Sequence, residues 1–144
     1  LAVGQVSPVA QRLLAITEKA LWAGIAQARS GNKLGDISAA IEQVGAQAGY
    51  GIVRDLVGHG IGRAMHEDPQ VPNFGRAGRG ITLRVGMTLA IEPMFNVGTH
   101  RIKVDSNNWA VRTADGQLSA HFEHTVAITQ DGPVPLTVLQ EDKA

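Results

Sequence analysis

The chain has 144 residues, which is enough for one compact domain or part of a larger one and too few for two full domains. Its 13 lysines and arginines balance 13 aspartates and glutamates, so no net charge is available to attract nucleic acid or an anionic membrane surface. With 44% hydrophobic residues and no apolar run of the roughly 18 residues that span a membrane, we expect a folded, soluble protein. There is no cysteine, which excludes a disulfide framework and leaves His, Asp and Glu as the available metal ligands.

Two helices are predicted in the first third of the chain. Ser7 followed by Pro8 is typical of a helix start, because serine caps free N–H groups and proline lacks the N–H that has no partner there. Apolar residues then recur at helical spacing, which predicts a long buried helix over residues 8–29. Asp36 is expected to cap a second helix, which Gly49 closes.

After Tyr50 the helical periodicity gives way to short β-type runs separated by Gly, Pro and Asn, a pattern typical of strands and turns. Asp115-Gly116 is typical of a hairpin turn and is expected to join the last two strands. Helices followed by strands indicate an α+β fold, here a single domain over residues 1–144. The expected strands are Ile52–Arg54, Met87–Pro93, Ala110–Thr113 and Ser119–Thr129.

Three acidic and imidazole side chains in the strand region suggest metal chemistry. Glu92 and Glu123 lie in apolar strands, where an unpaired carboxylate would be costly, so each needs a cation or several hydrogen-bond donors. His59 stands between glycines, which let the backbone come close to whatever its imidazole binds. One histidine and two carboxylates suit Zn, Co, Mn or Fe, and two carboxylates can bridge a pair of ions. A dinuclear hydrolase is the natural functional interpretation, with Glu92 as the group that accepts and passes on a proton.

Each of these residues also has a structural interpretation. A histidine in a glycine-rich loop is more often hydrogen-bonded than metal-bound, and Glu92 before a proline could simply end a strand. Glu123 could pair with Arg112 or Lys103. Their joint occurrence is the stronger argument for a metal site.

Two glycine-rich loops are not interpreted as ligand sites. The glycines of residues 58–62 are not a dinucleotide fingerprint, because no strand-to-helix transition follows them. The loop over residues 75–80 is basic, but a solvated turn is favoured over a specific anion site.

Four segments, taken in order, resemble type I methionine aminopeptidases, which have the pita-bread metallopeptidase fold. They are Gly58-His59-Gly60-Ile61-Gly62, Met65-His66-Glu67-Asp68-Pro69, the run from Gly86 to Pro93, and His121-Phe122-Glu123-His124-Thr125. The stretch from Gly62 to Met87 is too short for the helical insertion of the type II enzymes. The resemblance implies an antiparallel sheet covered by helices, two divalent metal ions (Co, Mn, Fe or Zn), and removal of the initiator methionine from nascent polypeptide N-termini in the cytoplasm.

The resemblance also implies roles for individual residues. His59, Glu92 and Glu123 match metal ligands, with Glu123 bridging both ions and Glu92 serving as the acid/base. His66 matches a histidine that contacts the scissile peptide and stabilises the tetrahedral intermediate. Two further residues match positions that line the pocket for the methionine side chain, Met65 and Trp109.

The chain departs from the family in two ways. Met65 stands where the bacterial enzymes carry an aromatic residue, and His121 stands where a glutamine is usual. Two aspartate ligands of the family are expected upstream of Leu1, so we expect the C-terminal portion of a catalytic domain, inactive on its own, with the missing N-terminal segment as one conceivable partner chain. None of the aspartates present fits the motif, namely Asp36, Asp55, Asp105, Asp115 and Asp131.

Two alternatives of a different kind remain open. A pita-bread domain can lose its metals and act as a binding module, although intact His59, Glu92 and Glu123 argue against that decay. A proline-specific aminopeptidase would share the histidine loop and the strand that ends at Pro93, but its closing strand typically differs around the last glutamate.

Overall fold

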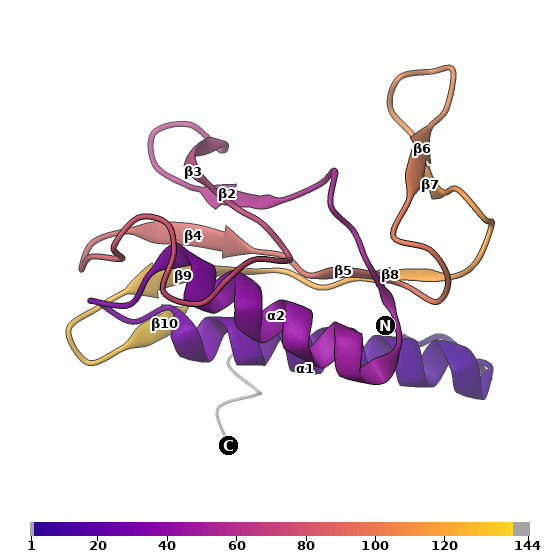
Figure 1. Cartoon of the computed structure of the whole chain (residues 1–144), viewed down its shortest axis with the longest axis horizontal. Helices are drawn as coiled ribbons and strands as arrows, with labels where there is room; N and C mark the ends of the chain where they lie inside the picture. Colours follow the sequence, from indigo (N-terminus) through magenta and orange to yellow (C-terminus); the bar gives the residue numbers. More distant parts are fainter. Residues whose placement is uncertain (1, 140–144) are drawn as a thin grey trace.

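The computed structural model describes residues 2–139 and has two helices packed side by side against a set of antiparallel strands (Figure 1). The helices are α1 (Pro8–Gln27) and α2 (Leu34–Ala48). The strands are β1 (Gly51–Ile52), β2 (Gly58–Gly60), β3 (Glu67–Val71), β4 (Thr88–Ile91), β5 (Met94–Asn96), β6 (Ile102–Val104), β7 (Val111–Thr113), β8 (Ser119–His121), β9 (His124–Ile128) and β10 (Pro133–Pro135). The predicted α+β class is confirmed. Neither helix of this part of the chain is long and apolar enough to cross a membrane.

Helix α1 begins where the sequence predicts and ends two residues earlier than expected. Ser7 accepts a hydrogen bond at Oγ from the Ala10 N–H over 3.3 Å, and Pro8 occupies the first helical position. The start of α2 differs from the prediction: the N-cap residue is Lys33, and Asp36 lies three positions into the helix. The Asp36 carboxylate reaches back to accept from the Lys33 N–H over 2.7 Å, so it caps the helix from inside rather than from its boundary.

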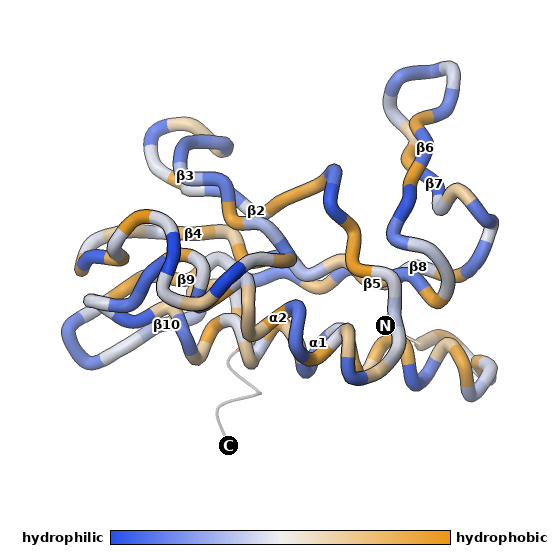
Figure 2. Tube along the Cα trace, viewed as in Figure 1, coloured by the Kyte–Doolittle hydropathy of each residue, from blue (hydrophilic) through white to orange (hydrophobic). Residues whose placement is uncertain are grey.

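The core lies between the helix pair and the strands. Fully buried side chains of the helices pack against buried side chains of the central strands. By contrast, the turn between β9 and β10, away from this core, is hydrophilic (Figure 2). Two glycines allow close packing, one between the two helices and one between α2 and a strand. A Cβ on Gly24 of α1 would lie 2.9 Å from Cγ1 of Ile41, and one on Gly45 of α2 would lie 2.7 Å from Cζ of Phe95. The largest fully buried residues include Phe95, Leu21, Ile37, Ile41, Leu89 and Ile91.

The strands form three sheets, and every strand pair among the described residues is antiparallel. The five-stranded sheet has the order β10-β9-β4-β2-β3, the three-stranded sheet has the order β1-β5-β8, and β6 pairs with β7. In the five-stranded sheet β4 pairs with β9, and in the three-stranded sheet β5 pairs with β8. The same two segments of chain therefore run together through both sheets.

The two longest predicted strands both differ from the structure, which corrects the sequence-based expectation. Within Met87–Pro93 the strand is only β4, and a separate strand, β5, begins just after the predicted end. Ser119–Thr129 divides into β8 and β9. Pro93 has no N–H to donate to a ladder, which accounts for the break between β4 and β5. The breaks face each other, since Ile91 pairs with His124 before them and Met94 pairs with His121 after them.

The prediction that Asp115-Gly116 joins two paired strands is wrong, because the strands on either side of this turn pair with other strands. A turn does form there, with the Gly116 N–H bonded to the Thr113 carbonyl and with Gly116 at φ +74°, but β7 pairs with β6 and β8 pairs with β5. The Asp115 carboxylate accepts from the Thr99 N–H over 2.7 Å and ties the turn to the preceding loop. Its hydrogen bonds to the backbone N–H groups of Thr99 and Gln117 hold the pKa of Asp115 below its usual value.

Five strands were not predicted from the sequence, because they are short or carry Gly and Pro. Strand β2 is Gly-His-Gly, β3 contains Pro69, β10 begins and ends with proline, and β5 and β6 have only three residues each. Strands β3 and β10 are the two edges of the five-stranded sheet, where a residue without an N–H is tolerated.

Candidate metal centre

The candidate site lies where the paired segments leave one sheet and enter the other. Glu92 and Pro93 separate β4 from β5, and Phe122 and Glu123 separate β9 from β8. The Phe122 N–H donates to the Pro93 carbonyl over 3.3 Å, which keeps the two breaks in register. Glu92 and Glu123 therefore lie next to each other between the two sheets, where neither residue belongs to a strand.

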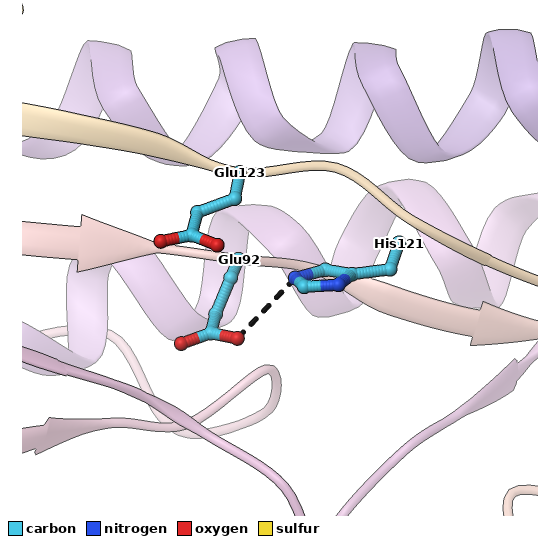
Figure 3. A group of neighbouring side chains, drawn as sticks. All are labelled: Glu92, His121 and Glu123. Carbon is cyan, nitrogen blue, oxygen red and sulfur yellow. Dashed lines mark ion pairs between the residues drawn. The ribbon is translucent and has the colours of Figure 1, made fainter. Parts of the chain in front are cut away.

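Glu92 is the most enclosed carboxylate of this region and lies between two histidines. Its side chain is 14% exposed. Oε1 lies 3.7 Å from Nε2 of His59, and Oε2 lies 3.2 Å from Nε2 of His121. In Figure 3 the carboxylates of Glu92 and Glu123 and the ring of His121 converge on one region.

His59 is presented to Glu92 by strand pairing. It stands opposite Ala90 in the β2–β4 pair, two residues before Glu92. Its Nδ1 lies 2.9 Å from the Gly60 carbonyl oxygen, and because a carbonyl only accepts, Nδ1 carries the proton in that hydrogen bond. Nε2, the opposite ring nitrogen, faces Oε1 of Glu92. This arrangement is typical of a metal-ligating histidine, whose second nitrogen is oriented by a backbone carbonyl.

His66 lies beside His59. The two ring centroids are 4.2 Å apart, with the rings tilted by 45°. The loop that carries His66 is held by Glu67, whose Oε1 accepts from the Ala64 N–H over 2.8 Å. A chain of neighbouring side chains thus runs from His66 through His59 and Glu92 to His121.

The donor set fits a divalent cation. One ligand atom each from Glu92, His121 and Glu123 can be chosen so that all three lie within 4.8 Å of one another. Within residues 2–139 neither glutamate forms an ion pair with lysine or arginine, and a partly buried carboxylate in that position calls for another cation. Imidazole and carboxylate donors together suit borderline metals such as Zn, Co, Mn and Fe.

The alternative in which Glu123 pairs with Arg112 or Lys103 is wrong. Arg112 Nε pairs with Asp105 Oδ2 over 2.6 Å, within the β6–β7 hairpin. Glu123 itself is exposed, whereas its place in an apolar run suggested burial. The reason is the strand break, which takes Glu123 out of both sheets.

Sequence reasoning gave His121 no role at the site, yet the structure brings it against Glu92. Donation of a hydrogen bond to Glu92 raises the pKa of His121, partial burial opposes that shift, and the negative charges of Glu92 and Glu123 add to it. The available signal was the spacing of His121 and Glu123, because residues two apart in an extended segment share one face.

Met65 and Trp109 are both highly exposed. Met65 is 75% exposed in the loop before β3, and Trp109 is 87% exposed between β6 and β7. These two loops rise on the side of the sheets that faces away from the helices (Figure 1). Their role in a pocket for the methionine side chain stays a prediction.

The sequence matches the profile of metallopeptidase family M24 over residues 1–130, and the chain belongs to that family. It is 52% identical over 139 residues to a methionine aminopeptidase of Clostridium acetobutylicum, covering 96% of this chain and 56% of that protein. The crystal structure of methionine aminopeptidase from Rickettsia prowazekii matches with a TM-score of 0.92 at 43% identity, covering 94% of this chain and 55% of that one. The chain thus spans about half the length of the relatives it matches.

A prolidase from Pyrococcus furiosus shares the fold more distantly. Its TM-score is 0.74 at 21% identity, covering 97% of this chain and 36% of that one. The pita-bread fold predicted from the four segments is confirmed by these neighbours, as is the resemblance to methionine aminopeptidases.

Proposed function

We propose that this chain is part of a methionine aminopeptidase, which hydrolyses the peptide bond after the initiator methionine of nascent proteins in the cytoplasm. Similarity to proteins of that name over nearly the whole chain supports the proposal. The observation that carries it is the approach of His59 Nε2 to Glu92 Oε1, 3.7 Å apart, with the opposite ring nitrogen bound to a backbone carbonyl.

His59, Glu92 and Glu123 would hold two divalent ions of the group Co, Mn, Fe and Zn. Such ions, when bound, polarise the scissile carbonyl and lower the pKa of water. Glu123 is the carboxylate proposed to be shared by both ions. Its exposed position next to Glu92 leaves room for that role.

Glu92 and His66 carry the proton transfer and the charge stabilisation in this proposal. Glu92 takes a proton from the attacking water and delivers it to the leaving amine, which a partly buried carboxylate can do without losing the proton to solvent. His66, on the other side of His59, donates a hydrogen bond to the carbonyl oxygen as negative charge develops on it. The exposed Met65 and Trp109 are proposed to close around the methionine side chain when substrate is present.

A peptide-release assay with chelation tests the proposal. The protein expressed from its complete reading frame is treated with EDTA, dialysed, and assayed on Met-Ala-Ser and on an Xaa-Pro peptide, with and without Mn²⁺ or Co²⁺. We expect methionine release only with added metal, and no cleavage of the Xaa-Pro peptide. Preferential cleavage of the Xaa-Pro peptide would indicate a proline-specific enzyme instead, and metal-independent release or no release with any metal would overturn the proposal.

A further inference from the structure

Among the described residues Glu92 pairs with two histidines, and the proposed mechanism gives no role to one of them, His121. It is the last residue of β8, opposite Met94 of β5, and its side chain is 46% exposed. The resemblance to methionine aminopeptidases implies a glutamine at this position, so the imidazole is a departure of this chain from the expected pattern. Imidazole is a much better ligand than a carboxamide for borderline divalent metals.

His121 is partly exposed, and its ring nitrogen is held close to two carboxylates. Nε2 lies 3.2 Å from Glu92 Oε2, a separation typical of two neighbouring ligands of one ion. A carboxylate oxygen of Glu123 completes a set of three donor atoms that all lie within 4.8 Å of one another. Among the described residues no other group hydrogen-bonds to the His121 ring, so the ring is free to turn its nitrogen toward a cation.

His121 and His59 approach opposite oxygens of the same carboxylate. His59 Nε2 faces Oε1 of Glu92, and His121 Nε2 faces Oε2. Glu92 is therefore the shared member of two donor groups, one with each histidine. Glu123 is the second carboxylate of the group that contains His121.

We propose that His121 is a further metal ligand, and that His121, Glu92 and Glu123 form a three-residue set for a divalent cation. This inference rests on the proposed metal-dependent function. It means that the imidazole of His121 adds to the donor set of Glu92 and Glu123, and that its replacement weakens the binding of borderline metals.

Metal binding by variants of the protein from its complete reading frame tests the proposal. Mn²⁺ is the probe, with affinity measured by isothermal titration and bound imidazole nitrogen measured by pulsed EPR. The variants are His121→Gln, which restores the usual residue of the relatives, and His121→Ala. His124→Gln is the matched control, because His124 lies on the same segment but its Nδ1 contacts Thr137 Oγ1 over 2.8 Å and its ring lies against Trp22.

We expect His121→Gln and His121→Ala to weaken Mn²⁺ binding by about 10–100-fold or more, since loss of even an outer-sphere partner has that effect. The imidazole modulation in the EPR signal should fall in both variants and remain unchanged in His124→Gln. A His121→Gln variant with the affinity and modulation of the wild type would overturn the proposal.

Two other outcomes are informative. If His121→Gln binds normally and only His121→Ala is weakened, the side chain merely orients Glu92 by a hydrogen bond, and the ligand role is wrong while the proposed function stands. If the wild-type protein binds no Mn²⁺, Co²⁺ or Zn²⁺, the proposed function fails together with this inference.

Discussion

The helix pair and the two interrupted strand segments, β4–β5 and β8–β9, differ in how regularly their sequence pattern repeats. In α1 and α2 apolar residues repeat with the helical period, and many of them are buried in contacts such as Ile41 against Gly24. In the two strand segments the regular pattern stops twice, and the residues at the stops are the ones that can bind a cation. The buried core thus lies where the repetition is regular, and the candidate metal ligands lie where it is interrupted.

The two regions meet at Phe95. This ring is fully buried, contacts the position of Gly45 on α2, and belongs to β5, which begins directly after Glu92-Pro93. The helix layer thus supports the strand that follows the break. Variants in each region should separate stability from metal binding and catalysis.

The largest loss of stability is expected for Phe95→Ala. Removal of a fully buried aromatic ring should lower the free energy of unfolding by about 3–5 kcal/mol. Urea unfolding followed by circular dichroism measures the change, with Val104→Ala as control, because Val104 is 58% exposed and should change stability by less than about 0.5 kcal/mol. A loss below 1 kcal/mol would mean that the ring is not part of the joint between the two regions.

His66→Ala should reduce turnover by about 10²–10³-fold in the protein from its complete reading frame, the loss expected when an oxyanion donor is removed. Its metal content should stay close to that of the wild type. His59→Ala should instead lower metal content, because His59 Nε2 is the nitrogen that faces Glu92. Equal metal loss in the two variants, measured by atomic absorption, would contradict this division of roles between neighbouring rings.

Glu92→Gln should lower turnover by about 10²-fold or more, since it keeps the shape of the side chain and removes the base. Its unfolding midpoint should remain near that of the wild type, because Glu92 is not part of the apolar core cluster and the substitution keeps the size of its side chain. Glu18→Gln on the exposed face of α1 is the control for loss of a carboxylate. Normal turnover by a folded, metal-loaded Glu92→Gln protein would rule out the acid/base role.

The smallest effect is expected for Asp36→Asn at the start of α2. The Asp36 carboxylate accepts from the N–H groups of Lys33 and Gly78, each over 2.7 Å, and these bonds hold the pKa of Asp36 below its ordinary value. A carboxyl whose folded pKa is lowered contributes stability above its unfolded pKa of about 3.9 and loses that contribution as pH falls through the folded pKa. At pH 7 the substitution should cost about 1 kcal/mol.

Unfolding measured from pH 7 down to pH 3 checks the sign of this effect. The difference in unfolding free energy between wild type and Asp36→Asn should shrink below about pH 4. Asp55→Asn, at an exposed position, serves as the control. If the difference in unfolding free energy stays constant or grows toward low pH, the charge of the Asp36 carboxylate does not stabilise the start of α2.

The helix pair could be predicted from the sequence because its determinants are local. Ser7, Pro8 and Gly49 act within one turn of where they stand, and only the cap at Asp36 was misplaced, because the carboxylate bonds backward to Lys33. The four chemistry-bearing segments could also be recognised, since their residue types are rare in apolar strands.

The geometry of the site could not be predicted from the sequence, because it depends on which strands pair. Asp115-Gly116 has good turn chemistry, yet β8 pairs with β5, more than 20 residues away in sequence, and this pairing brings His121 near Glu92. The exposure of Glu123 likewise follows from a break that only the partner strand defines. Local pattern predicts the elements, and long-range register determines which side chains meet.

The central claim is that the facing strand breaks form a metal centre. An anomalous difference map from crystals of the protein from its complete reading frame, grown with Mn²⁺, tests it most directly. We predict a peak coordinated by Glu92 and Glu123, with His59 bound through Nε2. Anomalous peaks only at other sites, with Glu92 still bonded to His121 and His59 pointing away, would contradict the account.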